Sequence, residues 1–189
     1  MTALRRFFVF KTRIRRAALV ARKGNAMQNN LSSKGVTALT RAALIAALYT
    51  ALTLLLAPIS YGQIQIRLSE CLTLLPVLLP EAIPALTVGC LLANILGGCS
   101  IFDIVLGTLA TLLAAVCTRL LRQNRMLAAA MPVLLNGLIV GAVVHYVYAP
   151  VVPLPLCMLS VAAGEIIPCM VLGPMLLRML AHLPSKYMA

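Results

Sequence analysis

The chain has 189 residues, of which 62% are hydrophobic and only 11% are charged. This composition excludes an ordinary soluble domain, whose core does not need so much apolar surface, and it predicts an all-α integral membrane protein. The net charge of +12 comes from basic residues that flank apolar runs. It therefore points to anionic lipid headgroups as partners and not to nucleic acid.

The N-terminal part of the sequence is basic. Residues 1–26 contain many Lys and Arg residues and no acid, and Met27 offers a second possible translation start. These residues are either a basic segment on the inner leaflet or an upstream start that is not used. We expect a basic N-terminal segment over 1–37, a six-helix membrane domain over 38–183 and a short tail over 184–189.

Apolar runs separated by turn signals predict the membrane spans. A full helical span needs about 20 residues, so the second and third runs are short and could form one broken span. Five crossings would then place the basic loop 119–125 outside. With six crossings and both termini cytoplasmic, every Lys and Arg except Arg67 lies inside, as the positive-inside rule requires. The sequence thus predicts a bundle with spans at 39–57, 70–80, 82–96, 101–118, 130–149 and 156–181.

All acidic residues lie within the apolar part of the chain. They are Glu70, Glu81, Asp103 and Glu165. A carboxylate near the centre of a bilayer costs about 2.5–3.5 kcal/mol, so it usually has a partner or a function. Glu165 is about ten residues into the last predicted span, hence about 15 Å deep. It has no capping role, and we interpret it as a ligand-binding or relay residue.

The other acids have alternative interpretations. Glu70 follows Arg67 by three residues at an outer helix end, and Asp103 fits a capping box with Ser100. Helix capping alone therefore remains an alternative role for both carboxylates. Glu81 lies at the predicted inner turn, where we expect a solvated loop residue.

Neutral polar and aromatic residues add further candidates. Asn94 ends the third predicted span at its outer end, and Asn136 is placed nearer the cytoplasm than Glu165. Both suit hydrogen bonds between membrane helices. Tyr61, in the first loop, fits either an aromatic belt or stacking on a planar ligand. The belt interpretation also covers Tyr49, Tyr146 and Tyr148.

Catalytic and metal-binding patterns are missing from the sequence. It has no GxxxxGK[ST], HExxH or GxSxG motif. The two histidines, His145 and His182, are predicted on opposite sides of the membrane, and the six cysteines are scattered without a CxxC pair. We therefore expect no enzyme, no cofactor and no metal site, and we interpret the cysteines as small hydrophobic residues.

Four segments within residues 38–181 carry a resemblance: RAALIAALYTALTLLLAPISYGQIQIRLSECLTLLPVLLPEAIPALTVGCLLANILGG, FDIVLGTLATLLAA, PVLLNGLIVG and SVAAGEIIPCMVLGPMLL. Together they resemble the QueT family of queuosine-precursor transporters. The resemblance implies a substrate-binding S component of an energy-coupling factor importer in a bacterial cell membrane. Such a component would dock on a transmembrane T component with two cytosolic ATPases. Its ligand would be queuine or another 7-deazaguanine precursor, a 7-deazapurine taken up from outside.

The same resemblance implies a docking motif in the first helix. S components carry an AxxxA motif there, which Ala43 and Ala47 match, while Ala42 and Ala46 lie one residue away. Small residues let another helix approach closely. Packing within the chain is the alternative explanation of this pattern.

A guanine-like ligand would suit the acidic residues. Its adjacent N–H donors can both bond one carboxylate, and a cationic aminomethyl precursor would also favour acids. We choose Glu165 first for its depth. The expected substrate-binding residues are Glu165, Glu70, Asp103, Asn94, Arg67, Tyr61 and Asn136.

Two other functions remain open from the residues alone. A stand-alone proton-coupled carrier would use Glu165 and His145 as its relay and would need no partner. A membrane scaffold protein would pair its acids structurally and bind no ligand.

Overall fold

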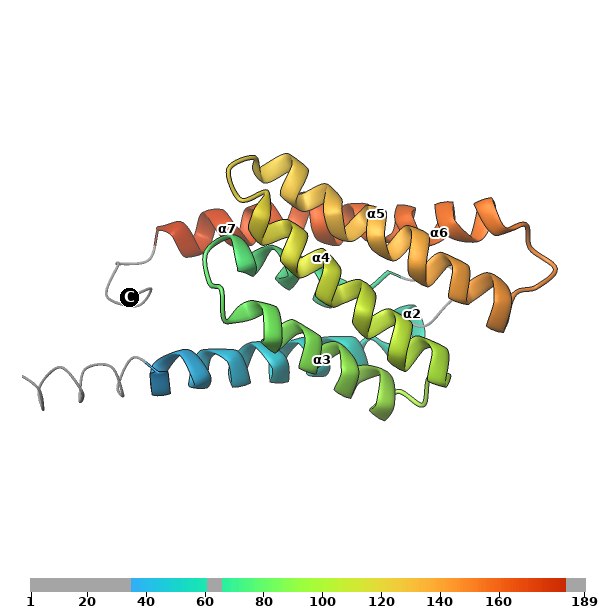
Figure 1. The fold of residues 1–189 in the computed structure, drawn as a ribbon, viewed down its shortest axis with the longest axis horizontal. Helices are drawn as coiled ribbons and strands as arrows, with labels where there is room; N and C mark the ends of the chain where they lie inside the picture. The colour runs from blue at the N-terminus through green and yellow to red at the C-terminus, as the bar shows by residue number, and fades with distance from the viewer. Residues whose placement is uncertain (1–34, 61–65, 183–189) are drawn as a thin grey trace, which may run out of the picture. The chain divides into compact units, whose positions relative to one another are not determined.

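The computed structural model describes residues 35–60 and 66–182, and these residues form helices without any strand (Figure 1). The chain begins, within this part, with the helix Gly35–Leu55. The further elements are α2 (Ala57–Ser60), the 3₁₀ helix η1 (Leu68–Val77), α3 (Ala82–Leu96), η2 (Asp103–Gly107), α4 (Thr108–Leu120), α5 (Arg125–Val143), η3 (Val144–Tyr148), α6 (Leu154–Ile166), η4 (Ile167–Leu172) and α7 (Gly173–Ala181).

Four helices of the described residues are long and apolar enough to cross a membrane. Their lengths are 21, 18, 24 and 28 residues, whereas η1 and α3 are shorter apolar helices. The prediction of an all-helical, multi-pass membrane protein is thereby confirmed. The number of crossings and the side of each terminus stay predictions. The long helices are Gly35–Leu55, Asp103–Leu120, Arg125–Tyr148 and Leu154–Ala181.

Three of these helices contain a π-helical segment. η2 precedes α4, η3 follows α5, and η4 joins α6 to α7. Pro168 lies in η4, where its missing N–H removes one helical hydrogen bond and the wider turn accommodates the ring. The last helix therefore continues past Pro168. Such π turns often accompany functional sites.

The short helix η1 is enclosed by the rest of the membrane domain. It packs against α3, α4, α5, η4 and α7. Its C-terminal carbonyls are satisfied from α4, because Arg119 Nη1 donates to the oxygens of Pro76 at 2.9 Å and Val77 at 3.0 Å. Irregular backbone is tolerated at membrane depth only when protein surrounds it in this way. The fold thus places Glu70, in the first turn of η1, among protein side chains.

Glycines allow the closest helix contacts. A Cβ at Gly141 of α5 would lie 2.5 Å from the Met158 Cα of α6, and one at Gly89 would lie 3.0 Å from the Ala46 carbonyl oxygen.

This packing buries only some of the alanines of the first helix. Ala46 is 8% exposed and faces α3, whereas Ala43 and Ala47 are exposed. Internal packing therefore explains Ala46 but not the Ala43–Ala47 pair.

We expect Gly141→Ala to destabilise the protein by about 1–3 kcal/mol, because the new methyl group overlaps the α6 backbone. Gly35→Ala is the matched control, since no atom lies within 4 Å of its Cβ position. That change should stabilise the helix by about 0.5–1 kcal/mol. Thermal unfolding in detergent measures both effects. Equal shifts in the two variants would contradict the close α5–α6 contact.

Candidate functional site

Glu70 and Glu165 are far apart in the sequence but adjacent in the structure. Glu70 is 0% and Glu165 1% exposed. A carboxylate oxygen of each and the Cys169 Sγ all lie within 4.8 Å of one another. The contact arises because η1 packs against η4, which directly follows α6. Two carboxylates therefore share one small buried volume inside a membrane domain.

Hydrogen bonds orient both carboxylates. The Tyr49 hydroxyl donates to Glu70 Oε1. Asn136 Nδ2 donates to Glu165 Oε1 at 3.3 Å, and the Cys169 thiol donates to Glu165 Oε2 at 3.4 Å. Among the described residues, Glu70 Oε2 and Asn136 Oδ1 are buried without a hydrogen-bond partner. These two acceptors are available to a ligand that carries N–H or O–H donors.

Arg67 supplies the positive charge of this site. It is 4% exposed, and its guanidinium interacts electrostatically with both Glu70 and Glu165. Its carbonyl oxygen also accepts the Glu70 N–H at 3.0 Å. A buried charge is tolerated when opposite charges accompany it. We call the six residues of this site the glutamate cluster: Tyr49, Arg67, Glu70, Asn136, Glu165 and Cys169.

The donor atoms of Glu70, Glu165 and Cys169 are close enough together to hold a metal ion. The neighbouring guanidinium of Arg67 repels a second cation in the same low-dielectric volume. We therefore assign no metal to the glutamate cluster, and the expected absence of a metal stays a prediction.

Asp103 belongs to a second group of polar residues, which we call the aspartate cluster: Asn94, Ser100, Asp103 and Tyr148. Ser100 Oγ accepts the Asp103 N–H at 3.3 Å and donates to Asp103 Oδ2 at 3.1 Å. The Tyr148 hydroxyl also donates to Oδ2. Asn94 Nδ2 donates to the Asp103 carbonyl oxygen at 3.1 Å. Ser100 thus caps this helix as predicted, and the carboxylate additionally ties η3 to η2.

Residues of α3 and α4 connect the two clusters. Asn94 Nδ2 lies 3.6 Å from Cys90 Sγ, which also accepts a hydrogen bond from Thr111 Oγ1 at 3.2 Å. Cys90 in turn contacts the Tyr49 hydroxyl. Gly107 makes room for the amide, because a Cβ there would lie 3.2 Å from Asn94 Nδ2. Buried polar groups therefore continue from the aspartate cluster to the glutamate cluster.

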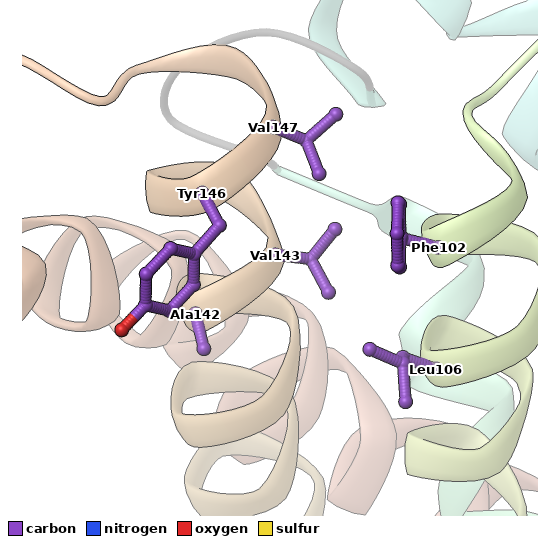
Figure 2. A pocket seen from close by; sticks show the side chains of 6 residues that line it. All are labelled: Phe102, Leu106, Ala142, Val143, Tyr146 and Val147. Atoms are coloured by element: carbon purple, nitrogen blue, oxygen red, sulfur yellow. The ribbon is translucent and has the colours of Figure 1, made fainter.

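The domain also has an apolar cavity of about 430 Å³ between the Asp103–Leu120 and Arg125–Tyr148 helices. Figure 2 shows Phe102 and Leu106 of one helix facing Val143 and Val147 of the other, with the Tyr146 hydroxyl directed away. No polar residue predicted from the sequence lines it. It therefore suits a hydrocarbon group and not a ligand rich in hydrogen-bond donors.

The sequence pattern of the QueT transporter family matches residues 39–182. The chain belongs to the QueT transporter family. A curated relative from Lactococcus lactis subsp. cremoris (strain MG1363), named queuosine precursor transporter QueT, is 42% identical over 72 residues. That match covers 37% of this chain and 42% of the relative, so it spans less than half of the relative's length. No solved structure matches the chain. QueT is a family of transporters and not of enzymes.

The structure of this QueT family member groups four of the predicted site residues, Arg67, Glu70, Asn136 and Glu165, in the glutamate cluster. Asp103 and Asn94 lie in the aspartate cluster, and Tyr61 falls outside the described residues. Asn136 and Glu165, which we placed at different depths, are joined by a hydrogen bond between α5 and α6.

Two members of the glutamate cluster were missed by the sequence interpretation. Tyr49, assigned to an aromatic belt, is fully buried and bonds Glu70. Its spacing from Ala42 and Ala46 placed it on the inward helix face. Cys169, interpreted as a small hydrophobic residue, lies one helical turn after Glu165 and reaches its carboxylate. This spacing was the available signal.

Glu81 also differs from expectation. Its side chain is only 16% exposed and pairs with Arg41 Nη1 at 3.4 Å, so it is not a solvated loop residue. The predicted relay partner His145 places its Nδ1 2.8 Å from the Val152 carbonyl oxygen. Neither residue is part of the two clusters.

We expect Tyr49→Phe to lower the free energy of unfolding by about 1–3 kcal/mol, because a buried carboxylate loses its donor. Tyr146→Phe is the matched control, since Tyr146 is 73% exposed. Thermal unfolding of the detergent-purified variants measures the difference. A Tyr49→Phe protein as stable as the control would show that the Tyr49–Glu70 bond contributes nothing to stability.

Proposed function

We propose that the chain is the substrate-binding membrane component of an importer for queuosine precursors. It would capture queuine or another 7-deazaguanine from outside, in a bacterial cell membrane that it crosses six times with both termini cytoplasmic. Membership in the QueT family and the name of the Lactococcus relative support queuosine precursors as the substrate class. The glutamate cluster supports the binding role.

One observation carries this proposal. Two carboxylates are buried in a membrane domain although Glu70 Oε2, among the described residues, has no hydrogen-bond donor. Buried acceptors without a donor are costly. The edge of a guanine-like ring offers adjacent N–H donors at N1 and at the exocyclic amine, which can satisfy a carboxylate in a charge-assisted pair. A 7-deazaguanine bound here would therefore complete the hydrogen bonding of the site.

The aspartate cluster supports a second contact with the ligand, made before the ligand reaches the glutamate cluster. Asp103 is 2% and Asn94 0% exposed, and the Oδ1 atom of each lacks a hydrogen-bond partner in the described part of the chain. We assign to them the first polar contacts of a ligand that enters from the outer face.

The energy for transport would come from partners. We propose a transmembrane T component with two cytosolic ATPases, as in energy-coupling factor importers. Of the two alanine pairs, Ala43 and Ala47 are exposed, whereas Ala46 packs against Gly89. The exposed pair is therefore our docking surface for the T component, and anionic lipid would bind the basic ends of the helices.

We expect Glu165→Gln to weaken the binding of queuine and 7-deazaguanine precursors by about 10- to 150-fold, which corresponds to one lost charge-assisted hydrogen bond. Equilibrium binding to the detergent-purified chain, with guanine as the comparison ligand, measures this. Glu81→Gln is the control, because Glu81 pairs with Arg41 outside both clusters. A well-folded chain that binds none of these ligands would favour a scaffold protein.

Replacing the exposed alanine at 47 tests the docking surface. We expect Ala47→Leu to reduce uptake by cells at least tenfold while ligand binding by the isolated chain is unchanged, because a bulky side chain keeps the partner helix away. Leu159→Phe, which enlarges an exposed side chain of α6, serves as the control. Unchanged uptake in the Ala47→Leu strain would exclude docking through this face.

A further inference from the structure

The charges of the glutamate cluster do not balance. Arg67 brings one positive charge, and Glu70 and Glu165 bring two negative charges when both are ionised. The other groups that face them are the Tyr49 phenol of the first helix, the thiols of Cys71 on η1, Cys90 on α3 and Cys169 on η4, and the Asn136 amide of α5. Phenols and thiols are neutral at ordinary pH. The empty cluster with both acids ionised would thus carry one uncompensated negative charge.

Such a charge is costly at this place. The two carboxylates are no more than 1% exposed, and an oxygen of one lies within 4.8 Å of an oxygen of the other. Like charges this close in an apolar interior oppose each other, and paired carboxyl groups commonly resolve this by sharing one proton. In the part of the chain that the structure describes, two further arginines have other partners: Arg41 pairs with Glu81, and Arg119 donates to the carbonyls of η1.

We propose that Glu70 and Glu165 together hold one proton when the site is empty, and that a ligand with one positively charged amino group replaces this proton. The ammonium group, in place of the ring edge, would donate to Glu70 Oε2, which has no donor among the described residues. The proton passes to bulk water, so the total charge of the cluster is the same before and after binding. This inference rests on the proposed function and narrows its substrate to monocationic 7-deazaguanines.

The proposal has a signature that simple hydrogen bonding lacks. Binding of a cationic ligand releases one proton, so by linkage its affinity rises about tenfold for each unit of pH over the range in which the empty cluster holds the proton and the bound cluster does not. A neutral ligand of the same shape leaves the proton in place. Its affinity should not vary with pH, and it should bind less tightly than the cation at the upper end of this range.

Calorimetry on the full chain in detergent tests the exchange, with 7-aminomethyl-7-deazaguanine and its neutral 7-hydroxymethyl analogue as ligands. Titrations in two buffers of different ionisation enthalpy give the number of protons released. We expect about one proton for the amine and none for the alcohol. Equal affinities without proton release would overturn the exchange and leave the proposed function standing. Failure of both ligands to bind would overturn both.

The charge variant Glu70→Gln makes a second test. It leaves one carboxylate opposite Arg67, so the cluster needs no proton. We expect proton release by the amine to disappear and the preference for the amine over the alcohol to be lost, while Glu81→Gln keeps both. A Glu70→Gln protein that still releases one proton would contradict the proposal. Should this variant not fold, the two ligands on the unaltered chain decide the question alone.

Discussion

The cost of holding charge in an apolar interior shapes this membrane domain. Glu70 and Glu165 are accommodated because Arg67 brings a positive charge and because Tyr49, Asn136 and Cys169 donate hydrogen bonds to them. Tyr49 and Asn136 come from elements that are distant in the sequence from the acid that each one bonds. The helices must therefore pack as they do for any one of the charges to be tolerated. Among the described residues, Glu70 Oε2 and Asn136 Oδ1 are left without a donor, and we propose that a ligand supplies one.

The backbone provides for this cluster in two ways. The short helix η1 is surrounded by other helices, so its carbonyls and Glu70 are kept from lipid, with Arg119 completing its C-terminal end. Glycines then allow close contact between the helices that surround it: Gly89 meets the first helix, and Gly141 meets α6. The π turn at η4 follows Glu165 directly and carries Cys169. The site thus depends on irregular segments that lie inside a regular helical frame.

Much of this arrangement follows from the sequence, because the bilayer restricts a spanning chain to a few solutions. Hydrophobic runs gave the helical class and the bounds 82–96 of α3, and the rarity of intramembrane acids selected Glu70 and Glu165. The sequence did not reveal which side chains of different helices contact one another. Tyr49 looks like a belt tyrosine until η1 is seen beside it, and the bond from Asn136 to Glu165 joins two different helices. Glu81 looked solvated because its partner Arg41 lies on another helix.

A structure of the full chain with a bound 7-deazaguanine tests the central claim most directly. The account predicts ligand N–H groups within hydrogen-bond distance of Glu70 Oε2 and of the Glu165 carboxylate, with Tyr49 and Asn136 still bonded as in the empty site. A ligand seated instead in the apolar cavity beside Phe102 and Val143, with both glutamates untouched, would contradict it.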